Sequence, residues 1–358
     1  MSEPRVELHL GDCVDWLRSL PDGSVDAVVT DPPAGIKFMG KGWDSDHGGR
    51  DRWVEWLAVR MSDARRVAKP GSYALVWALP RTSHWTGWAL EEAGWAIRDR
   101  VSHLFGTGFP KGKASLKPAC EDWWLAWNPT KRVKPLGIDR CRIPANGESL
   151  AGGMVSARTE GWDRPWKHDP EAIAACKARL AANVEKTEAL GRWPANVTHD
   201  GSDEVMEAFA ALGESKSRIG KPRGSAAPGV GWGMTKTGAE YDDAGTPARF
   251  FYAAKASKAD RGEDNTHPTV KNTVLMRWLC RLIAEPGDII LDPFAGSGST
   301  LVAAIAEGMN AVGIERDPEY HAIAQRRIAD ARRPCVAVGK TVKPSPGQLS
   351  LFPSEDVA

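Results

Sequence analysis

The sequence predicts an α/β protein with a doubly wound, mostly parallel sheet. Two segments at opposite ends of the 358-residue chain carry this prediction, at 25–34 and at 288–306. In each segment, a short apolar run ends in an aspartate and an irregular turn. Such a run is typical of a parallel strand in a sheet that helices cover on both faces. Ligands bind at the carboxyl ends of such strands. We therefore expect both aspartates at the functional edge of the sheet.

Strand and helix patterns follow one another along the first part of the chain. An alternating run at 6–10 leads to Asp12, which we expect to cap a helix at 13–20. Lys69-Pro-Gly71 is expected to end a longer helix. The other predicted strands are at 25–30, 72–77, 95–104 and 123–127. The other predicted helices are at 50–69 and between the strand at 72–77 and residue 93.

The segment Asp31-Pro-Pro-Ala34 directly follows the second predicted strand. Because prolines fix the backbone and lack an amide hydrogen, the Asp31 carboxylate and the Pro32 carbonyl are held as two acceptors. Two acceptors match the two hydrogens of an exocyclic amine. Alone, such a segment is most often a turn, but beside a second glycine-rich strand end it indicates an active site.

A glycine turn follows the apolar strand near the end of the chain. Gly296 and Gly298 permit a tight turn and close approach of the backbone to a ligand. Ser299 and Thr300 are expected to cap the helix that follows.

The acidic residue after this helix favours a nucleoside-like ligand. Glu315 ends a strand-like run, where its carboxylate can accept hydrogen bonds from ribose hydroxyls. No lysine follows the glycines, which disfavours a phosphate-binding P-loop, and the turn lacks the third glycine of dinucleotide-binding proteins. A cofactor with a nucleoside and no pyrophosphate fits better, and S-adenosyl-L-methionine is the obvious one.

The middle of the chain, at 136–248, differs in composition from both ends. Apart from a helical run at 170–190, it is rich in glycine, proline and serine, and 213–236 is expected to be a mobile loop. We expect an insertion that contacts the substrate, with a poorly ordered linker as the alternative. Helical patterns return from residue 274 and at 318–332, before a flexible tail at 336–358.

Two basic segments, at 98–142 and 213–236, are expected to flank the site and hold the phosphates of a nucleic acid, with salt-sensitive binding. A solvated face is the alternative. The side chains expected to contact these backbone phosphates are Lys111, Lys113, Lys117, Lys216, Arg218, Lys221 and Arg223.

Whole-chain composition limits the class of protein. Lys and Arg number 47 against 46 Asp and Glu, so a nucleic-acid surface requires an uneven distribution of charge. Six cysteines without a Cys-x-x-Cys pair argue against a zinc site or a disulfide framework. Without a signal peptide or a long apolar run, we expect a soluble, cytoplasmic protein that has no contact with a membrane.

The order of these motifs resembles that of DNA amino-methyltransferases of the beta group, which transfer a methyl group from S-adenosyl-L-methionine to an exocyclic nitrogen of a base. The matching segments are Gly11-Asp12, Asp31-Pro-Pro33, Gly106-Thr-Gly-Phe-Pro-Lys111, His267-Pro-Thr-Val-Lys271, Asp292-Pro-Phe-Ala-Gly-Ser-Gly298 and Gly313-Ile-Glu-Arg-Asp317. The resemblance implies a seven-stranded methyltransferase sheet. It also implies a catalytic half at 1–135, a target-recognition region at 136–248 and a cofactor-binding half at 249–335.

The resemblance further implies a role for each matching residue. Asp31, Pro32 and Pro33 form the catalytic motif, Asp12 and Cys13 face the adenine of the cofactor, and the others bind its ribose and methionine. The residues expected to bind the cofactor are Asp12, Cys13, Thr269, Lys271, Asp292, Phe294, Ala295, Gly296, Ser297, Gly298, Ser299 and Glu315.

One position departs from the family pattern. The family motif usually ends in Tyr or Phe, which stacks on the target base, whereas this chain has Ala34. Stacking on an aromatic ring is worth about 1–3 kcal/mol per base. We expect Phe38 or Trp43 to supply the ring; the alternative places both rings in the hydrophobic core.

The predicted reaction is methyl transfer to an amine of a DNA base, of the kind used in restriction–modification. An aspartate at the head of the motif favours adenine-N6. The base must leave the duplex or belong to single-stranded DNA. The alternatives are methylation of cytosine-N4, of RNA or of protein glutamine, and a DNA-binding protein that has lost catalysis. The sequence leaves open whether the chain forms a homodimer.

Overall fold

The computed structural model describes residues 3–108, 113, 116–144, 190–216, 244–255 and 265–333, together with 170, 171, 174, 175, 178 and 182. The strands are β1 Val6–Leu10, β2 Val25–Thr30, β3 Ala68–Ala78, β4 Ala96–Leu104, β5 Cys120–Trp127, β6 Val197–His199, β7 Ser215–Lys216, β8 Ala244–Gly245, β9 Tyr252–Ala253, β10 Ile289–Asp292 and β11 Asn310–Glu315. The helices are α1 Cys13–Ser19, α2 Arg50–Val67, α3 Ser83–Glu92, α5 Asp203–Ala210, α6 Thr273–Ile283, α7 Ser299–Ala306 and α8 Pro318–Arg332. The 3₁₀ turns within these residues are at Phe38–Gly40, Gly42–Asp44, Ile138–Arg140 and Pro247–Phe250.

One large sheet organises the described residues. Its strand order is β1-β11-β10-β2-β3-β5-β4-β6-β9, and only the two pairs that involve β5 are antiparallel. The predicted doubly wound, mostly parallel sheet is confirmed. The expected number of seven strands is wrong, because the sheet has nine: two short strands, β6 and β9, extend it beyond β4.

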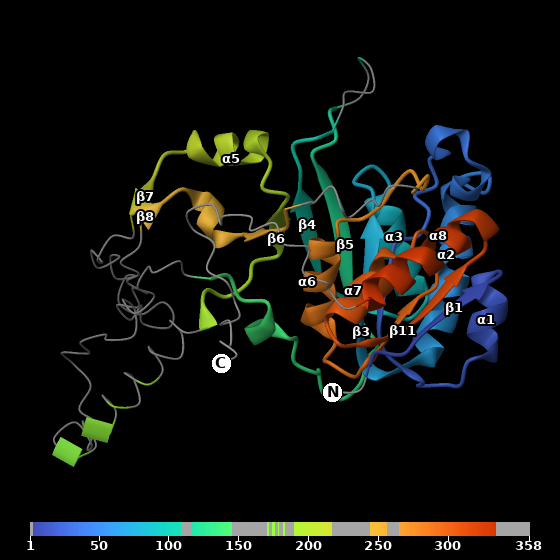
Figure 1. Cartoon of the computed structure of the whole chain (residues 1–358), viewed down its shortest axis with the longest axis horizontal. Helices are drawn as coiled ribbons and strands as arrows, with labels where there is room; N and C mark the ends of the chain where they lie inside the picture. Colours follow the sequence, from blue (N-terminus) through green and yellow to red (C-terminus); the bar gives the residue numbers. More distant parts are fainter. Residues whose placement is uncertain are drawn as a thin grey trace, which may run out of the picture.

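Helices cover both faces of this sheet. Figure 1 shows α6, α7 and α8 together on one face, where α6 contributes Leu275, Trp278 and Leu279 to the first of two apolar clusters. The second cluster contains Leu17 of α1 and Trp53 of α2, and lies on the other face. Strands buried on both faces explain the continuous apolar runs of the sequence.

Two local predictions are corrected. The helix predicted at 50–69 ends slightly earlier, at Val67, and the strand predicted at 72–77 begins at Ala68, so that it contains Lys69-Pro-Gly71. The register between β2 and β3 shifts there, which accommodates a proline without an amide hydrogen. At α7 the N-cap is Gly298, with φ of 79°, and neither Ser299 nor Thr300 caps the helix.

The carboxyl ends of the parallel strands meet at one edge of the sheet. Leu10 pairs with Glu315, and Asp292 pairs with Gly313. Because β5 runs antiparallel to β3, it is the amino end of β5, at Cys120, that lies at this edge. We call it the functional edge, since it contains both predicted strand ends.

The predicted helix at 170–190 and loop at 213–236 lie largely outside the described residues, and the tail at 336–358 lies wholly outside them. Within the described part of the chain, no helix is both long and apolar enough to span a membrane.

Candidate active site

A cavity of about 770 Å³ opens at the functional edge, between segments from both ends of the chain. Of the predicted catalytic, cofactor-binding and base-binding residues, all but Gly298 line it. They are Asp12, Cys13, Asp31, Pro32, Pro33, Ala34, Phe38, Trp43, Thr269, Lys271, Asp292, Phe294, Ala295, Gly296, Ser297, Ser299 and Glu315. The two predicted motifs therefore share one cavity.

Asp292 joins the two halves of the cavity. Its Oδ1 accepts hydrogen bonds from Thr30 Oγ1 at 2.6 Å and from Phe294 N at 3.1 Å. Burial raises the pKa of Asp292 to about 6, against the opposing effect of these hydrogen bonds. The carboxylate thus fixes the start of the glycine turn to the neighbouring strand β2.

The glycine turn has a conformation that other residues adopt with strain. Gly296 has φ of 52°, and a Cβ there would lie 3.0 Å from His267 Nε2. Arg327 of α8 donates to the Ser297 carbonyl at 2.6 Å and to Ser299 Oγ at 3.1 Å. The turn is therefore held from outside by an arginine, while its inner side faces the cavity.

Glu315 lies at the end of β11 with its carboxylate at the cavity wall. Oε2 accepts a hydrogen bond from Gly296 N at 2.8 Å, and Oε1 accepts one from Asp317 N at 2.7 Å. Burial raises the pKa of Glu315. A carboxylate has about four acceptor sites, so two amide donors leave capacity for the hydroxyls of a ligand.

An aromatic and basic wall closes this end of the cavity. Trp56 and Phe294 approach with ring centroids 5.7 Å apart, and the Arg60 guanidinium lies 4.3 Å from the Trp56 centroid. Asp12 caps α1 as predicted, accepting from Val14 N at 2.9 Å. Asp12 also lies 3.7 Å from Arg60.

Burial raises the pKa of the Cys13 thiol to about 12. The thiol is therefore protonated at neutral pH, as expected for a cysteine that does not serve as a nucleophile.

Asp31 also lines the cavity, where it faces a lysine and a second acid. Lys271 Nζ lies 3.5 Å from Asp31 Oδ2 and 3.0 Å from Glu121 Oε2. Burial raises the pKa of Asp31 to about 7; Glu121 and Asp292 add to this effect, whereas Lys271 opposes it. Lys271, expected at the methionine of a cofactor, directs its ammonium toward these two carboxylates.

The segment after Ala34 is folded around one buried carboxylate that the sequence analysis did not single out. Asp44 is 1% exposed and accepts from the backbone amides of Gly35 at 2.7 Å and Phe38 at 2.8 Å. Phe38 and Trp43 are half-buried, line the cavity and belong to neither apolar cluster. The alternative that both rings are core residues is therefore wrong.

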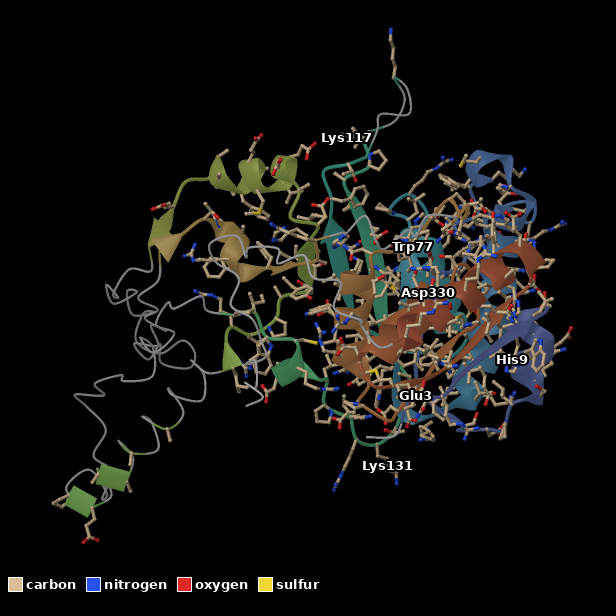
Figure 2. All side chains as sticks on the ribbon, in the orientation of Figure 1. Glu3, His9, Trp77, Lys117, Lys131 and Asp330 are labelled. Atoms are coloured by element: carbon tan, nitrogen blue, oxygen red, sulfur yellow. The ribbon has the colours of Figure 1, made fainter. Side chains whose placement is uncertain are left out.

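The basic residues do not all flank the cavity. Lys113 and Lys117 are exposed in the connection between β4 and β5, at the functional edge. Figure 2 shows Lys117 and Lys131 on opposite sides of Trp77, because β5 carries the chain to the other edge. The part of the basic run after β5 is thus away from the site. Lys216 forms part of β7, whereas Lys111, Arg218, Lys221 and Arg223 lie outside the described residues.

Several cavity residues were not predicted. Glu121 and Trp77 come from β5 and β3, His103 comes from β4, and Trp56 and Arg60 come from α2. No motif marks them, and Glu121 reaches the site only because β5 is antiparallel. Among the described residues, no group of three or more His, Cys, Asp or Glu side chains could hold a metal ion.

Comparison with known proteins identifies a family. The family model N6_N4_Mtase, described as DNA methylase, matches residues 25–326. The DNA adenine methyltransferase YhdJ of Escherichia coli (strain K12) is 44% identical over 66 residues, or 18% of this chain. YubD of the same organism is 45% identical over 67 residues, or 19% of this chain. These matches span 22% and 30% of the two relatives' own lengths.

Solved structures of DNA methyltransferases align over most of the chain. The PvuII DNA methyltransferase (cytosine-N4-specific) has a TM-score of 0.49 at 16% identity, with 92% of this chain and 94% of that chain covered. The M1.HpyAVI–SAM complex has a TM-score of 0.45 at 16% identity, with 90% and 98% covered.

Proposed function

The chain belongs to the DNA methylase family, and we propose that it transfers a methyl group from S-adenosyl-L-methionine to the N6 amine of adenine in DNA. One observation carries the proposal: the Asp31 motif and the glycine turn after Asp292 line the same cavity. A donor seated at one strand end and an acceptor held at the next would then be in contact. The specific choice of adenine rests on the aspartate at position 31, and the relative YhdJ is a DNA adenine methyltransferase by name.

The cavity residues fit S-adenosyl-L-methionine. Glu315 has free acceptor sites for ribose hydroxyls, and the ring pair of Trp56 and Phe294 offers an apolar surface to a purine. Gly296 lets the backbone approach the ligand, because a Cβ there would meet His267. When bound, the cofactor supplies an electrophilic methyl group on its sulfonium.

Asp31 and the Pro32 carbonyl act on the target amine. The amine of adenine is a weak nucleophile because its lone pair is delocalised into the ring. If both of its hydrogens are held by these acceptors, the nitrogen becomes more tetrahedral and its lone pair points at the methyl group. Catalysis then depends on positioning and electrostatics, without a covalent enzyme intermediate.

The target base must enter the cavity from outside a duplex, by flipping or as part of a single strand. Phe38 and Trp43 line the cavity beside Ala34 and would stack on the base in place of the missing motif aromatic. Lys113 and Lys117 would hold phosphates at the functional edge. The region 136–248 would carry target recognition.

Methyl transfer from labelled cofactor to unmethylated DNA, with nucleoside analysis of the product, tests the proposal. N6-methyladenine is the expected product. N4-methylcytosine would contradict the choice of base but keep the reaction. Label in RNA or protein alone would contradict the substrate, and no label in spite of cofactor and DNA binding would contradict catalysis.

A further inference from the structure

Glu121 is a second carboxylate near Asp31 in the cavity wall, and it is half-buried. Its Oε2 accepts a hydrogen bond from Trp77 Nε1 at 2.7 Å and lies 3.0 Å from Lys271 Nζ. The side chains of Glu121 and Lys271 are only 16% and 12% exposed. The ammonium group therefore lies between two carboxylates, 3.0 Å from Glu121 and 3.5 Å from Asp31.

Aromatic rings cover another side of this ammonium group. Lys271 Nζ lies 3.8 Å from the centroid of Trp77 and 5.8 Å from that of Trp123. Cations over an indole face are attracted by the ring quadrupole, more strongly where water is excluded. With two carboxylates and a ring face around it, Lys271 is held beside Asp31.

The position of this charge matters to the reaction. Asp31 binds an amine best as an ionised carboxylate with free acceptor sites, and a cation beside it keeps it ionised. A lysine in close contact would also occupy those sites and compete with the amine. Glu121 binds the same ammonium at the shorter distance, so Asp31 stays near this positive charge without forming a tight ion pair with Lys271.

We propose that Glu121 is a positioning residue for methyl transfer, which holds Lys271 close enough to Asp31 to favour its charge and too far to block it. This inference rests on the proposed function. It assigns Lys271 to the acceptor side of the reaction, through contacts with Asp31 and Glu121 that the structure displays.

Among the described residues, the charged and titratable groups that act on Asp31 and Glu121 include Lys271, Asp292 and His103. Lys271, Glu121 and Asp292 act on Asp31. Burial works to raise the pKa of Glu121, but Lys271 and His103, with hydrogen bonds from Lys271 and Trp77, outweigh burial and lower it. The pKa of His103 is itself lowered, mainly by burial, so its ring is neutral at neutral pH.

The substitution Glu121→Gln tests this inference through the pH dependence of kcat. The change removes a negative charge near Asp31 and frees Lys271 to approach it, and both effects lower the pKa of Asp31. We expect the acid limb of the profile to move down by about 1 pH unit. We also expect kcat at pH 8 to fall about 10- to 100-fold, with cofactor affinity and the KM for DNA nearly unchanged.

Lys271→Met provides a variant with the opposite sign. It removes the cation that favours the charged form of Asp31, so the acid limb should move to higher pH. This variant keeps the inference testable if Glu121→Gln does not fold. An unmoved acid limb in the folded variants, or shifts in the same direction, would overturn the inference.

Glu307→Gln is the matched control. Glu307 is also a poorly exposed carboxylate, which accepts from Arg277 at 2.6 Å and Arg281 at 2.7 Å, but it does not line the cavity. Glu307→Gln should lower thermal stability and leave the acid limb of the pH profile in place. An acid limb shifted as far as in Glu121→Gln would indicate a global effect of lost charge and would overturn the inference. If the wild type methylates no DNA, the proposed function fails. If the wild type is active and Glu121→Gln leaves the profile unchanged, only this inference fails.

Discussion

Thr30 Oγ1 donates a 2.6 Å hydrogen bond to Asp292 Oδ1 across 262 positions of sequence, inside the core. The bond joins the carboxyl ends of the adjacent parallel strands β2 and β10. Because Asp31 follows Thr30 directly, it must lie beside the glycine turn. This contact places a predicted catalytic acid and a predicted cofactor turn in one cavity.

Asp31→Asn should lower the rate of methyl transfer about 10²- to 10³-fold, the cost of losing one group that stabilises charge in a transition state. The amide has one acceptor oxygen and no charge, whereas the carboxylate has two acceptor oxygens and a negative charge. Cofactor affinity, measured by calorimetry, should stay within about 2-fold, because Asp31 is expected to hold the target amine and not the cofactor. Asp330→Asn, an exposed change on α8, is the control and should leave the rate unchanged. A rate near that of the wild type in Asp31→Asn would contradict the assigned role.

The same substitution should stabilise the protein at high pH. Burial raises the pKa of Asp31 from its ordinary value of 3.8 to about 7. The folded state thus binds this proton more tightly than the unfolded state, and the free energy of unfolding falls as pH rises from about 4 to about 7. Asp31→Asn removes that loss, so its Tm should exceed that of the wild type by about 2–4 °C at pH 8. The difference should shrink as the pH falls and become small near pH 4, close to the ordinary pKa of the carboxyl group in the unfolded state. Thermal melts at both pH values measure this, and a lower Tm for Asp31→Asn at pH 8 would contradict it.

Phe38→Ala and Trp43→Ala should separate the ring that stacks on the base from the one that does not. Loss of the stacking ring should raise the KM for DNA by about 5- to 150-fold, equivalent to about 1–3 kcal/mol. Trp88→Ala removes a ring on α3 that is 41% exposed and outside the cavity, and serves as the control. Full activity and unchanged DNA affinity in both cavity variants would rule out a replacement for the aromatic missing at Ala34.

Gly296→Ala should weaken cofactor binding by at least about 10-fold, since the added Cβ displaces a neighbour in the cavity wall at a cost of about 1 kcal/mol or more. The added Cβ would lie 3.0 Å from His267 Nε2 in the wall of the cavity. Gly308→Ala is matched in strain, with φ of 70°, and lies outside the cavity. Both variants should melt earlier, but only Gly296→Ala should bind the cofactor more weakly. Equal cofactor affinity in the two, measured by calorimetry, would mean that the turn does not contact the ligand.

Local patterns predicted most elements because those elements bury apolar runs. The final helix, predicted at 318–332, forms at those residues, and Asp12 caps its helix. The start of β3 was predicted too late, at residue 72 and not at Ala68, because a register shift lets proline lie within this strand. The two additional strands were missed because β6 and β9 are too short to show a pattern.

The sequence predicted those site residues that directly follow an apolar strand. Asp31 and Glu315 follow apolar runs, so their place at strand ends could be inferred. Glu121 could not be inferred, because the antiparallel direction of β5 is a property of the whole sheet. Asp44 was missed for a related reason: its carboxylate accepts hydrogen bonds from backbone amides of a turn, where the sequence has no regular periodicity.

A crystal structure of the complex with S-adenosyl-L-methionine tests the central claim most directly. We predict the ribose at Glu315, the methionine along the turn at Gly296, and the sulfonium methyl directed toward Asp31. Between the methyl carbon and Asp31 there should be room for one amine nitrogen, about 3–3.5 Å from the methyl. A cofactor bound elsewhere, or with its methyl directed away from Asp31, would contradict the account.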